Sequence, residues 1–195
     1  LGLVALGLVD TLMVGRISAE ALGGVALGNY WKFFWVTFGQ GCLVALDGLI
    51  SRAVGAGDRE GVGAGLTGGL VLAVLYSVLL SPLLLLCGPA LRALGQPASL
   101  VPFASRYSAV QVLSVLPALL FVVLRQTLQA TGSMGPLLAA VLMANALNVF
   151  LNAALIWGLP GLGIPALGPM GSSWATVWSG WALLLAVAVL GRGAL

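Results

Sequence analysis

Residues 136–157 read PLLAAVLMANALNVFLNAALIW, an apolar run without a charged side chain. A helix rises about 1.5 Å per residue, so a run of this length matches the roughly 30 Å hydrocarbon core of a bilayer. Backbone groups in hydrocarbon must bond within their own segment, which favours a helix over an open strand. The run therefore predicts a transmembrane helix.

Three amides lie on one face of this run. Asn145, Asn148 and Asn152 stand at relative positions 0, 3 and 7, so at about 100° per residue they fall within roughly 60° of one another. Amides facing lipid would be costly, and the stripe must face protein or a water-filled cavity. Two interpretations stay open: hydrogen bonds that only fasten helices together, or a polar site.

The rest of the chain has a similar composition. Its 195 residues are 61% hydrophobic and 7% charged, whereas soluble domains carry roughly 25% charged residues. We predict an all-α integral membrane domain, a bundle of six transmembrane helices that fills residues 1–195, with a first helix that is clipped at its start. The expected helices cover about 1–14, 25–50, 66–87, 101–124, 136–157 and 170–190.

A carboxylate interrupts the first apolar run. Asp10 precedes Arg16 by six residues, which places it roughly 9 Å from the end of its helix. An ionised carboxylate in hydrocarbon costs several kcal/mol, so Asp10 must have a functional or a structural reason to be there. The candidates are a proton or sodium site, a counter-ion for a cationic substrate, or a buried hydrogen bond to a neighbouring helix.

Other polar side chains lie within the predicted spans. Lys32 stands among aromatic residues that favour the membrane interface, and we expect it to extend its ammonium to that interface. Gln40, Asn145 and Thr176 are our candidates for lining a substrate cavity. Small residues at four-residue spacing, as in Gly24 and Gly28, predict closely packed helices.

Several classes of protein are excluded or disfavoured. The chain has no histidine, which rules out His-Glu-x-x-His zinc motifs and Ser-His-Asp triads, and its five acids are scattered. We therefore expect no enzyme activity, no catalytic residues and no metal site. The net charge of +3 is spread along the chain, which disfavours a nucleic-acid partner. Cys42 and Cys87 both lie in apolar stretches and imply no disulfide framework.

Four motifs in order carry a resemblance to a known family. They are VDTLMVG at 9–15, ALDGLISRAVGAGD at 45–58, LRQTLQA at 124–130 and ANALNVFLN at 144–152. Together they resemble the multidrug and toxic compound extrusion (MATE) transporters, in the branch common in bacteria, along essentially the whole chain.

The resemblance implies a twelve-helix protein of the cell membrane, with two six-helix lobes, of which this chain is the N-terminal one. It implies that Asp10 couples transport to H⁺ or Na⁺, without any other cofactor, and that Asn148 and Asn152 line the same cavity. Some relatives carry an acid where this chain has Asn152. The implied partners are the lipid bilayer, the C-terminal six-helix lobe of the same protein, and small amphipathic or cationic substrates.

We therefore expect a cation-coupled antiporter that exports such compounds. One alternative is a flippase for lipid-linked precursors in the same superfamily, which would need cationic side chains for a diphosphate headgroup. The other is a membrane scaffold without transport activity, in which Asp10 and the asparagines only hold helices together.

Overall fold

The computed structural model describes residues 12–15 and 17–193, and nearly all of them are helical. The elements are α2 (Ala19–Leu43), α3 (Ala45–Gly55), α4 (Arg59–Leu85), α5 (Cys87–Ala93), α6 (Val101–Ala130), α7 (Met134–Trp157), a 3₁₀ turn η1 (Pro160–Leu162) and α8 (Pro169–Gly191). With α2 and α3 counted as one, five described helices are long and apolar enough to cross a membrane. The first expected helix, with Asp10, lies outside the described residues except for 12–14.

Two helices begin earlier than apolar composition predicts. α2 begins at Ala19 rather than near Val25, because the Ser18 hydroxyl caps it by accepting from the Ala21 amide at 3.0 Å. α4 begins at Arg59 rather than near Leu66, because the Asp58 carboxylate accepts from the Gly61 amide at 2.9 Å. A hydropathy window does not detect a first helical turn that is made of polar residues.

A short helix also stands where the sequence predicted only a loop. α5 occupies the start of the segment 88–102, and Pro89 falls in its first turn, where a missing amide is tolerated. Pro82 and Pro117 lie inside α4 and α6, where each removes one backbone hydrogen bond of its helix.

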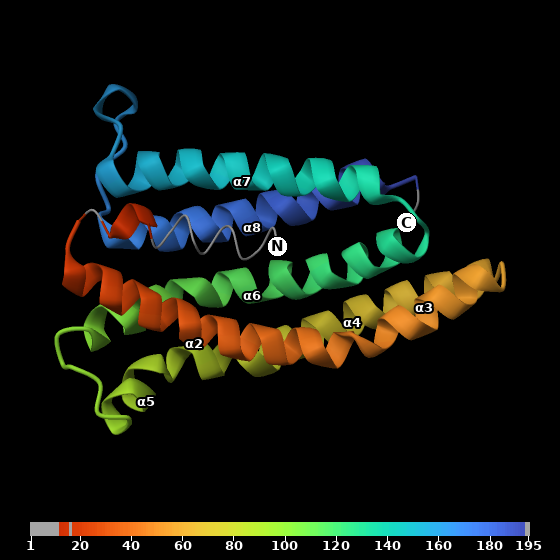
Figure 1. Ribbon diagram of the computed structural model, residues 1–195, viewed down its shortest axis with the longest axis horizontal. Coiled ribbons are helices and arrows are strands. Elements are labelled where there is room, and N and C mark those ends of the chain that lie inside the picture. The colour runs from red at the N-terminus through yellow and green to blue at the C-terminus, as the bar shows by residue number, and fades with distance from the viewer. Residues whose placement is uncertain (1–11, 16, 194–195) are drawn as a thin grey trace.

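The long helices lie side by side along the longest axis of the molecule (Figure 1). α2, α6 and α8 run in one direction, whereas α4 and α7 run in the other. α6 is the central helix. One apolar core joins it to α2, α3 and α4, and a second joins it to α7 and α8.

Glycines bring these helices into close contact, as their spacing predicted. A Cβ atom on Gly28 would lie 2.8 Å from the Ala104 carbonyl oxygen on α6. A Cβ atom on Gly171 would lie 2.5 Å from the Leu155 carbonyl oxygen on α7. Close backbone approach of this kind stabilises helix pairs in lipid, where no hydrophobic drive brings helices together.

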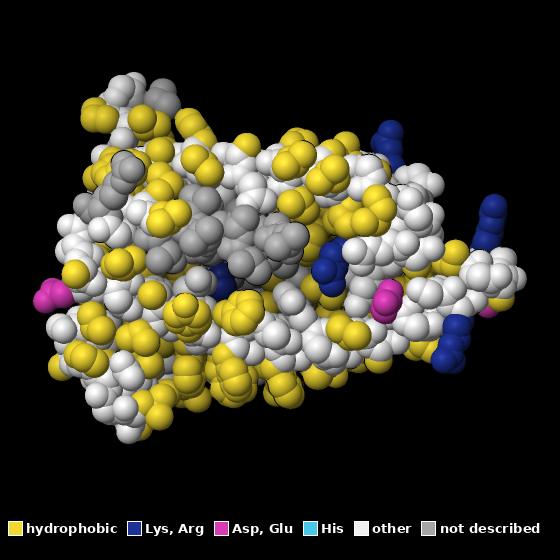
Figure 2. Space-filling view, viewed as in Figure 1, with side chains coloured by type: hydrophobic (Ala, Val, Ile, Leu, Met, Phe, Trp, Pro, Cys, Tyr) yellow, Lys and Arg dark blue, Asp and Glu magenta, His cyan; other side chains and the backbone are white. Residues whose placement is uncertain are grey.

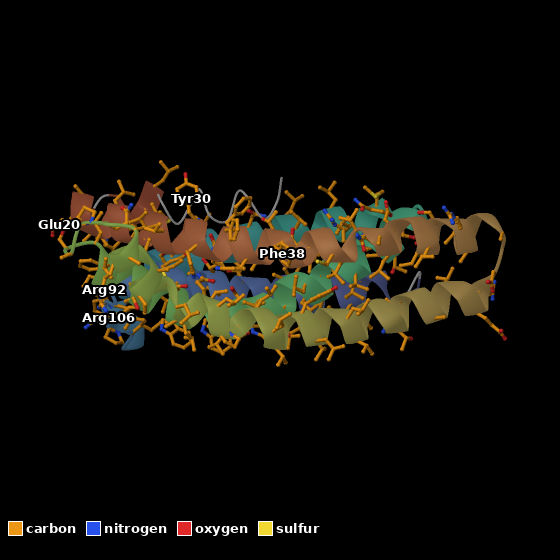
Figure 3. The ribbon with its side chains drawn as sticks, turned by 90° about the horizontal axis from the view of Figure 1, so that it is seen from below. Glu20, Tyr30, Phe38, Arg92 and Arg106 are labelled. Carbon is orange, nitrogen blue, oxygen red and sulfur yellow. The ribbon has the colours of Figure 1, made fainter. Side chains whose placement is uncertain are left out.

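Many of the charged side chains visible in Figure 2 lie toward the two ends of the bundle, although Lys or Arg atoms are also visible in its middle, and apolar side chains cover much of its length. Glu20, Arg92 and Arg106 lie at one end (Figure 3). Large apolar side chains such as Phe34, Leu79 and Leu142 are about 60% exposed, as expected of surfaces that face lipid.

Candidate functional site

Two asparagines form a buried pair on α7. Asn148 and Asn152 are both fully buried, and they lie one turn apart. The Asn152 amide nitrogen donates to the backbone oxygen of Asn148 at 3.0 Å and to its Oδ1 at 3.1 Å. Among the described residues, the Asn148 amide nitrogen has no acceptor. A buried donor of this kind requires an acceptor such as a carboxylate or a water molecule.

Hydroxyl groups of α8 lie at the same level of the bundle. Gly171 packs on Leu155, and because α7 and α8 are antiparallel, the residues of α8 up to 179 pass alongside Asn152 and Asn148. Thr176 is 6% exposed, and its hydroxyl donates to the Ser172 carbonyl at 3.1 Å. The buried hydroxyls of Ser172 and Ser179 have no partner within the described part of the chain. We call Asn148, Asn152, Ser172, Thr176 and Ser179 the polar layer.

A second polar network joins α2, α6 and α8. Gln111 is fully buried, and its Oε1 accepts from the Ser114 hydroxyl at 2.7 Å and from the Lys32 ammonium at 3.3 Å. Its amide nitrogen donates to the Ser173 carbonyl at 3.4 Å, and the Ser173 hydroxyl donates to the Tyr107 carbonyl at 3.1 Å. The network therefore reaches α8 at the residue beside Ser172 of the polar layer.

The expectation that Lys32 reaches the membrane interface is wrong. Lys32 lies within about 40° of Gly28 and Val36 around the helix, and both of these residues are buried. The aromatic side chains Tyr30, Phe33, Phe34 and Phe38 are exposed on other faces. Lys32 therefore points inward, because its position on the helix, rather than its aromatic neighbours in sequence, sets its direction.

The structure brings together only some of the candidate residues. Asn148, Asn152 and Thr176 belong to the polar layer, whereas Asp10 lies outside the described residues. The Asn145 amide donates to the Val141 carbonyl of its own helix at 2.7 Å and is only half-buried. Gln40 is half-buried on α2.

Our sequence reasoning missed the connection between Lys32 and Gln111. One signal could have found it, because Lys32 follows Gly28 by four residues and precedes Gly39 by seven. These offsets place the lysine on the glycine face, where α2 packs closely against its neighbours.

Comparisons with known proteins agree with this fold. The MatE family model matches residues 1–154. The chain is 37% identical over 190 residues to a probable multidrug resistance protein NorM of Caulobacter vibrioides, covering 97% of this chain and 40% of that protein. It is 32% identical over 188 residues to the protein of that name in Rhizobium meliloti, covering 96% and 39% respectively. The chain thus spans about 40% of the length of these relatives.

Solved structures show the same fold. A eukaryotic MATE transporter superposes with a TM-score of 0.87 at 22% identity, covering 98% of this chain and 42% of that one. An inward-facing multidrug resistance MATE transporter superposes with a TM-score of 0.83 at 23% identity, covering 95% and 41%. The expected all-α membrane fold is confirmed, and it matches less than half of each transporter.

The family is one of transporters and not of enzymes, as the sequence predicted. The chain, a multi-pass protein of the cell membrane, therefore belongs to the MATE family.

Proposed function

We propose that this chain is the N-terminal lobe of a cation-coupled antiporter that exports small amphipathic, often cationic compounds. The relatives that it matches are named as multidrug resistance proteins, and they are about two and a half times as long. The remaining length suits a second lobe of similar size, and alternating access requires two lobes that move against each other.

The observation that carries the proposal is the buried Asn148–Asn152 pair on a helix without charged residues. The Asn148 amide nitrogen has no acceptor among the described residues and requires one, and the sequence offers Asp10 as a carboxylate within an apolar run. In the proposed cycle, Asp10 takes up H⁺ or Na⁺, and Asn148 and Asn152 bind Asp10 or the water of a bound ion. Ion and substrate bind alternately if each binds a different conformation of the transporter more tightly, by a few kcal/mol.

The charge distribution supports one orientation. Arg52, Arg59, Arg125 and Arg192 lie near one end of the bundle, and among the described residues Arg92 and Arg106 lie near the other. Arg16 precedes α2 in the sequence and counts with the second group, so the positive-inside rule favours the first end as the cytoplasmic one by four arginines to three. None of the described arginines is buried, which favours the antiporter over a flippase that would hold a diphosphate in a cationic cavity.

Efflux of a fluorescent cationic dye from proteoliposomes tests the proposal. The complete transporter is compared with its Asp10→Asn, Asn148→Leu and Asn145→Leu variants under an imposed proton or sodium gradient. We expect Asp10→Asn to abolish gradient-driven efflux and Asn148→Leu to reduce it strongly.

Asn145→Leu is compared at saturating dye, where a weaker contact with substrate does not limit efflux; its amide bonds to its own helix in the described structure, so the ion dependence of efflux should be unchanged. We also propose contacts of Gln40 and Asn145 with substrate, which would change the apparent affinity for dye rather than the ion dependence. Equal efflux in wild type and Asp10→Asn would refute the antiporter and favour a structural role for the polar residues.

A further inference from the structure

The connection between α7 and α8 is a structured hairpin, residues 158–168, which we call the α7–α8 hairpin. The Leu159 amide donates to the Ile164 carbonyl at 3.0 Å, and the Ile164 amide donates to the Leu159 carbonyl at 3.2 Å. The base of the hairpin is tied to α7, because the Leu167 amide donates to the Leu155 carbonyl at 2.8 Å. The hairpin therefore holds a defined position at the end of α7.

The α7–α8 hairpin projects sideways from the bundle (Figure 1). It leaves the end of α7 on the side turned away from the central helix α6, and it runs across the helix axes rather than along them. A segment that continued along the axes would enter the water beyond the membrane. A segment that projects across them, at the level of a helix end, lies over the lipid that surrounds the bundle.

Trp157 marks the depth at which the hairpin begins. It is the last residue of α7, and it follows Phe150 and Met143 at seven-residue spacing, so the three lie within about 40° of one another around the helix. All three side chains are about half exposed or more, as on the rest of the surface that faces lipid. Tryptophan favours the boundary between hydrocarbon and water. The lipid-facing stripe of α7 therefore reaches this boundary at the base of the hairpin.

The side chains of the hairpin suit the boundary layer of a bilayer. Its exposed residues with described side chains are Pro160, Pro165, Ala166 and Leu167, and the others that are exposed are glycines. The sequence has no charged residue from position 126 through 191. Proline has no amide to pair, and backbone groups that stay unpaired can bond to water or headgroups at the boundary, although not in the hydrocarbon core.

We infer that the α7–α8 hairpin is a lipid-binding element, which places its apolar side chains in the boundary layer of the bilayer beside Trp157. Binding of this kind grows with the apolar area that enters the boundary layer and with attraction to anionic lipids. The hairpin carries no charge, so it depends on the first contribution and binds phospholipids whatever the charge of their headgroups. It thereby anchors the joined ends of α7 and α8, the two helices that carry the polar layer, at a fixed depth.

The position of the hairpin assigns the leaflet. It lies at the end of the bundle that holds Arg92 and Arg106 (Figures 1 and 3). In the orientation proposed above, that leaflet is the outer one. The inference does not depend on antiport, because it concerns a surface far from the proposed coupling residues and can be tested without any transport assay.

Spin labels on the complete transporter in phosphatidylcholine vesicles test this inference. Gly161→Cys places the label on the hairpin, where an added Cβ atom meets nothing within 4 Å, and Ala166→Cys is a second site in case the first variant does not fold. The native thiols are removed by Cys42→Ala and Cys87→Ala. Collisions of the label with oxygen, which concentrates in lipid, and with a water-soluble nickel complex report its surroundings.

Two control sites set the scale of the measurement. Gly55→Cys is exposed at the opposite end of the bundle, where the label should meet water, and an added Cβ atom has room there. Leu142→Cys lies on the lipid-facing surface of α7.

We expect labels on the hairpin to collide with nickel several-fold less often than the label at Gly55→Cys, and with oxygen nearly as often as the label at Leu142→Cys. Nickel collisions as frequent as those at Gly55→Cys would place the hairpin in water and overturn the inference. Low collision rates with both oxygen and nickel would mean that protein, such as the second lobe, covers the hairpin, and this result would also overturn it.

Discussion

Replacing Gln111 with Leu removes one acceptor of the Lys32 ammonium. A hydrogen bond to a charged group contributes about 1.5–3 kcal/mol, and hydrogen bonds between membrane helices contribute about 0.6–2 kcal/mol. The Lys32–Gln111 bond joins α2 to α6 at 3.3 Å and belongs to both classes. We expect it to contribute about 2 kcal/mol to the free energy of unfolding.

The other losses in this variant are small. Ser114 keeps its bond to the Gln111 backbone carbonyl at 2.7 Å, and the bond from the Gln111 amide to Ser173 is long at 3.4 Å. Gln111→Leu should therefore lower the free energy of unfolding by about 2–3 kcal/mol in total. Lys32→Met loses the same bond together with the other interactions of Lys32, so this single variant does not isolate the bond.

A double-mutant cycle isolates the pair, because the other contacts of Lys32 cancel in it. Lys32→Met, Gln111→Leu and the double variant are unfolded in mixed micelles by titration with SDS, and we expect an interaction energy of about 2 kcal/mol. The control cycle pairs Lys32→Met with Thr37→Val. Thr37 is exposed and lies about 140° from Lys32 around α2, so these two changes should add within about 0.5 kcal/mol. An interaction energy below about 0.5 kcal/mol for Lys32 and Gln111 would refute the inward direction of the lysine.

Three further predictions concern the fold. Gly171→Ala should lower the free energy of unfolding by about 1–3 kcal/mol, because its Cβ atom would meet the Leu155 carbonyl. Gly180→Ala on the same helix has room for a Cβ atom and should leave the stability nearly unchanged; thermal unfolding of the two variants compares them. Asp58→Ala removes the cap of α4 and should cost about 1 kcal/mol, whereas Asp58→Asn should retain most of the stability, as measured by the same unfolding assay. Burial raises the pKa of the Cys87 thiol, so its thiolate is scarce at pH 8; maleimide labelling should be slow in the folded protein and accelerate on unfolding, and rapid labelling of folded protein would contradict this.

The membrane spans were predictable because each needs about 20 apolar residues, and a run of that length can be recognised from its composition alone. The ends of the helices were not, since Ser18 and Asp58 extend α2 and α4 through bonds from single polar side chains. α5 was missed because seven residues with Gly88 and Pro89 resemble a loop. A short helix depends on packing rather than on its own sequence pattern, and here Cys87 and Leu91 pack against α6.

Within the site, the sequence predicted which residues share a face but not what each amide bonds. Asn145 and Asn148 stand three residues apart, yet the first bonds its own backbone and the second has a buried amide without a described acceptor. Which of the two outcomes occurs depends on how each amide faces the neighbouring helix. That orientation is set by the packing of the helices and not by the sequence of one helix. Lys32 shows the same principle, because its partner Gln111 is 79 residues away in sequence.

The span formed by α2 and α3 packs against both α6 and α4, and its closest contacts shift from α6 toward α4 along its length. Its first part meets α6 through Gly24 and Gly28, where an added Cβ atom would collide with residues of that helix. Its second part meets α4 through Leu46 and Ile50, which fill the space above the α4 glycines. The helix is interrupted between the two parts, at Val44, which is 57% exposed. Trp31 of α2 also donates to the Leu83 carbonyl of α4 at 3.0 Å, so α2 is held against both helices, and a movement of α4 past α6 would strain the packing of α2 as well as bend the span at Val44.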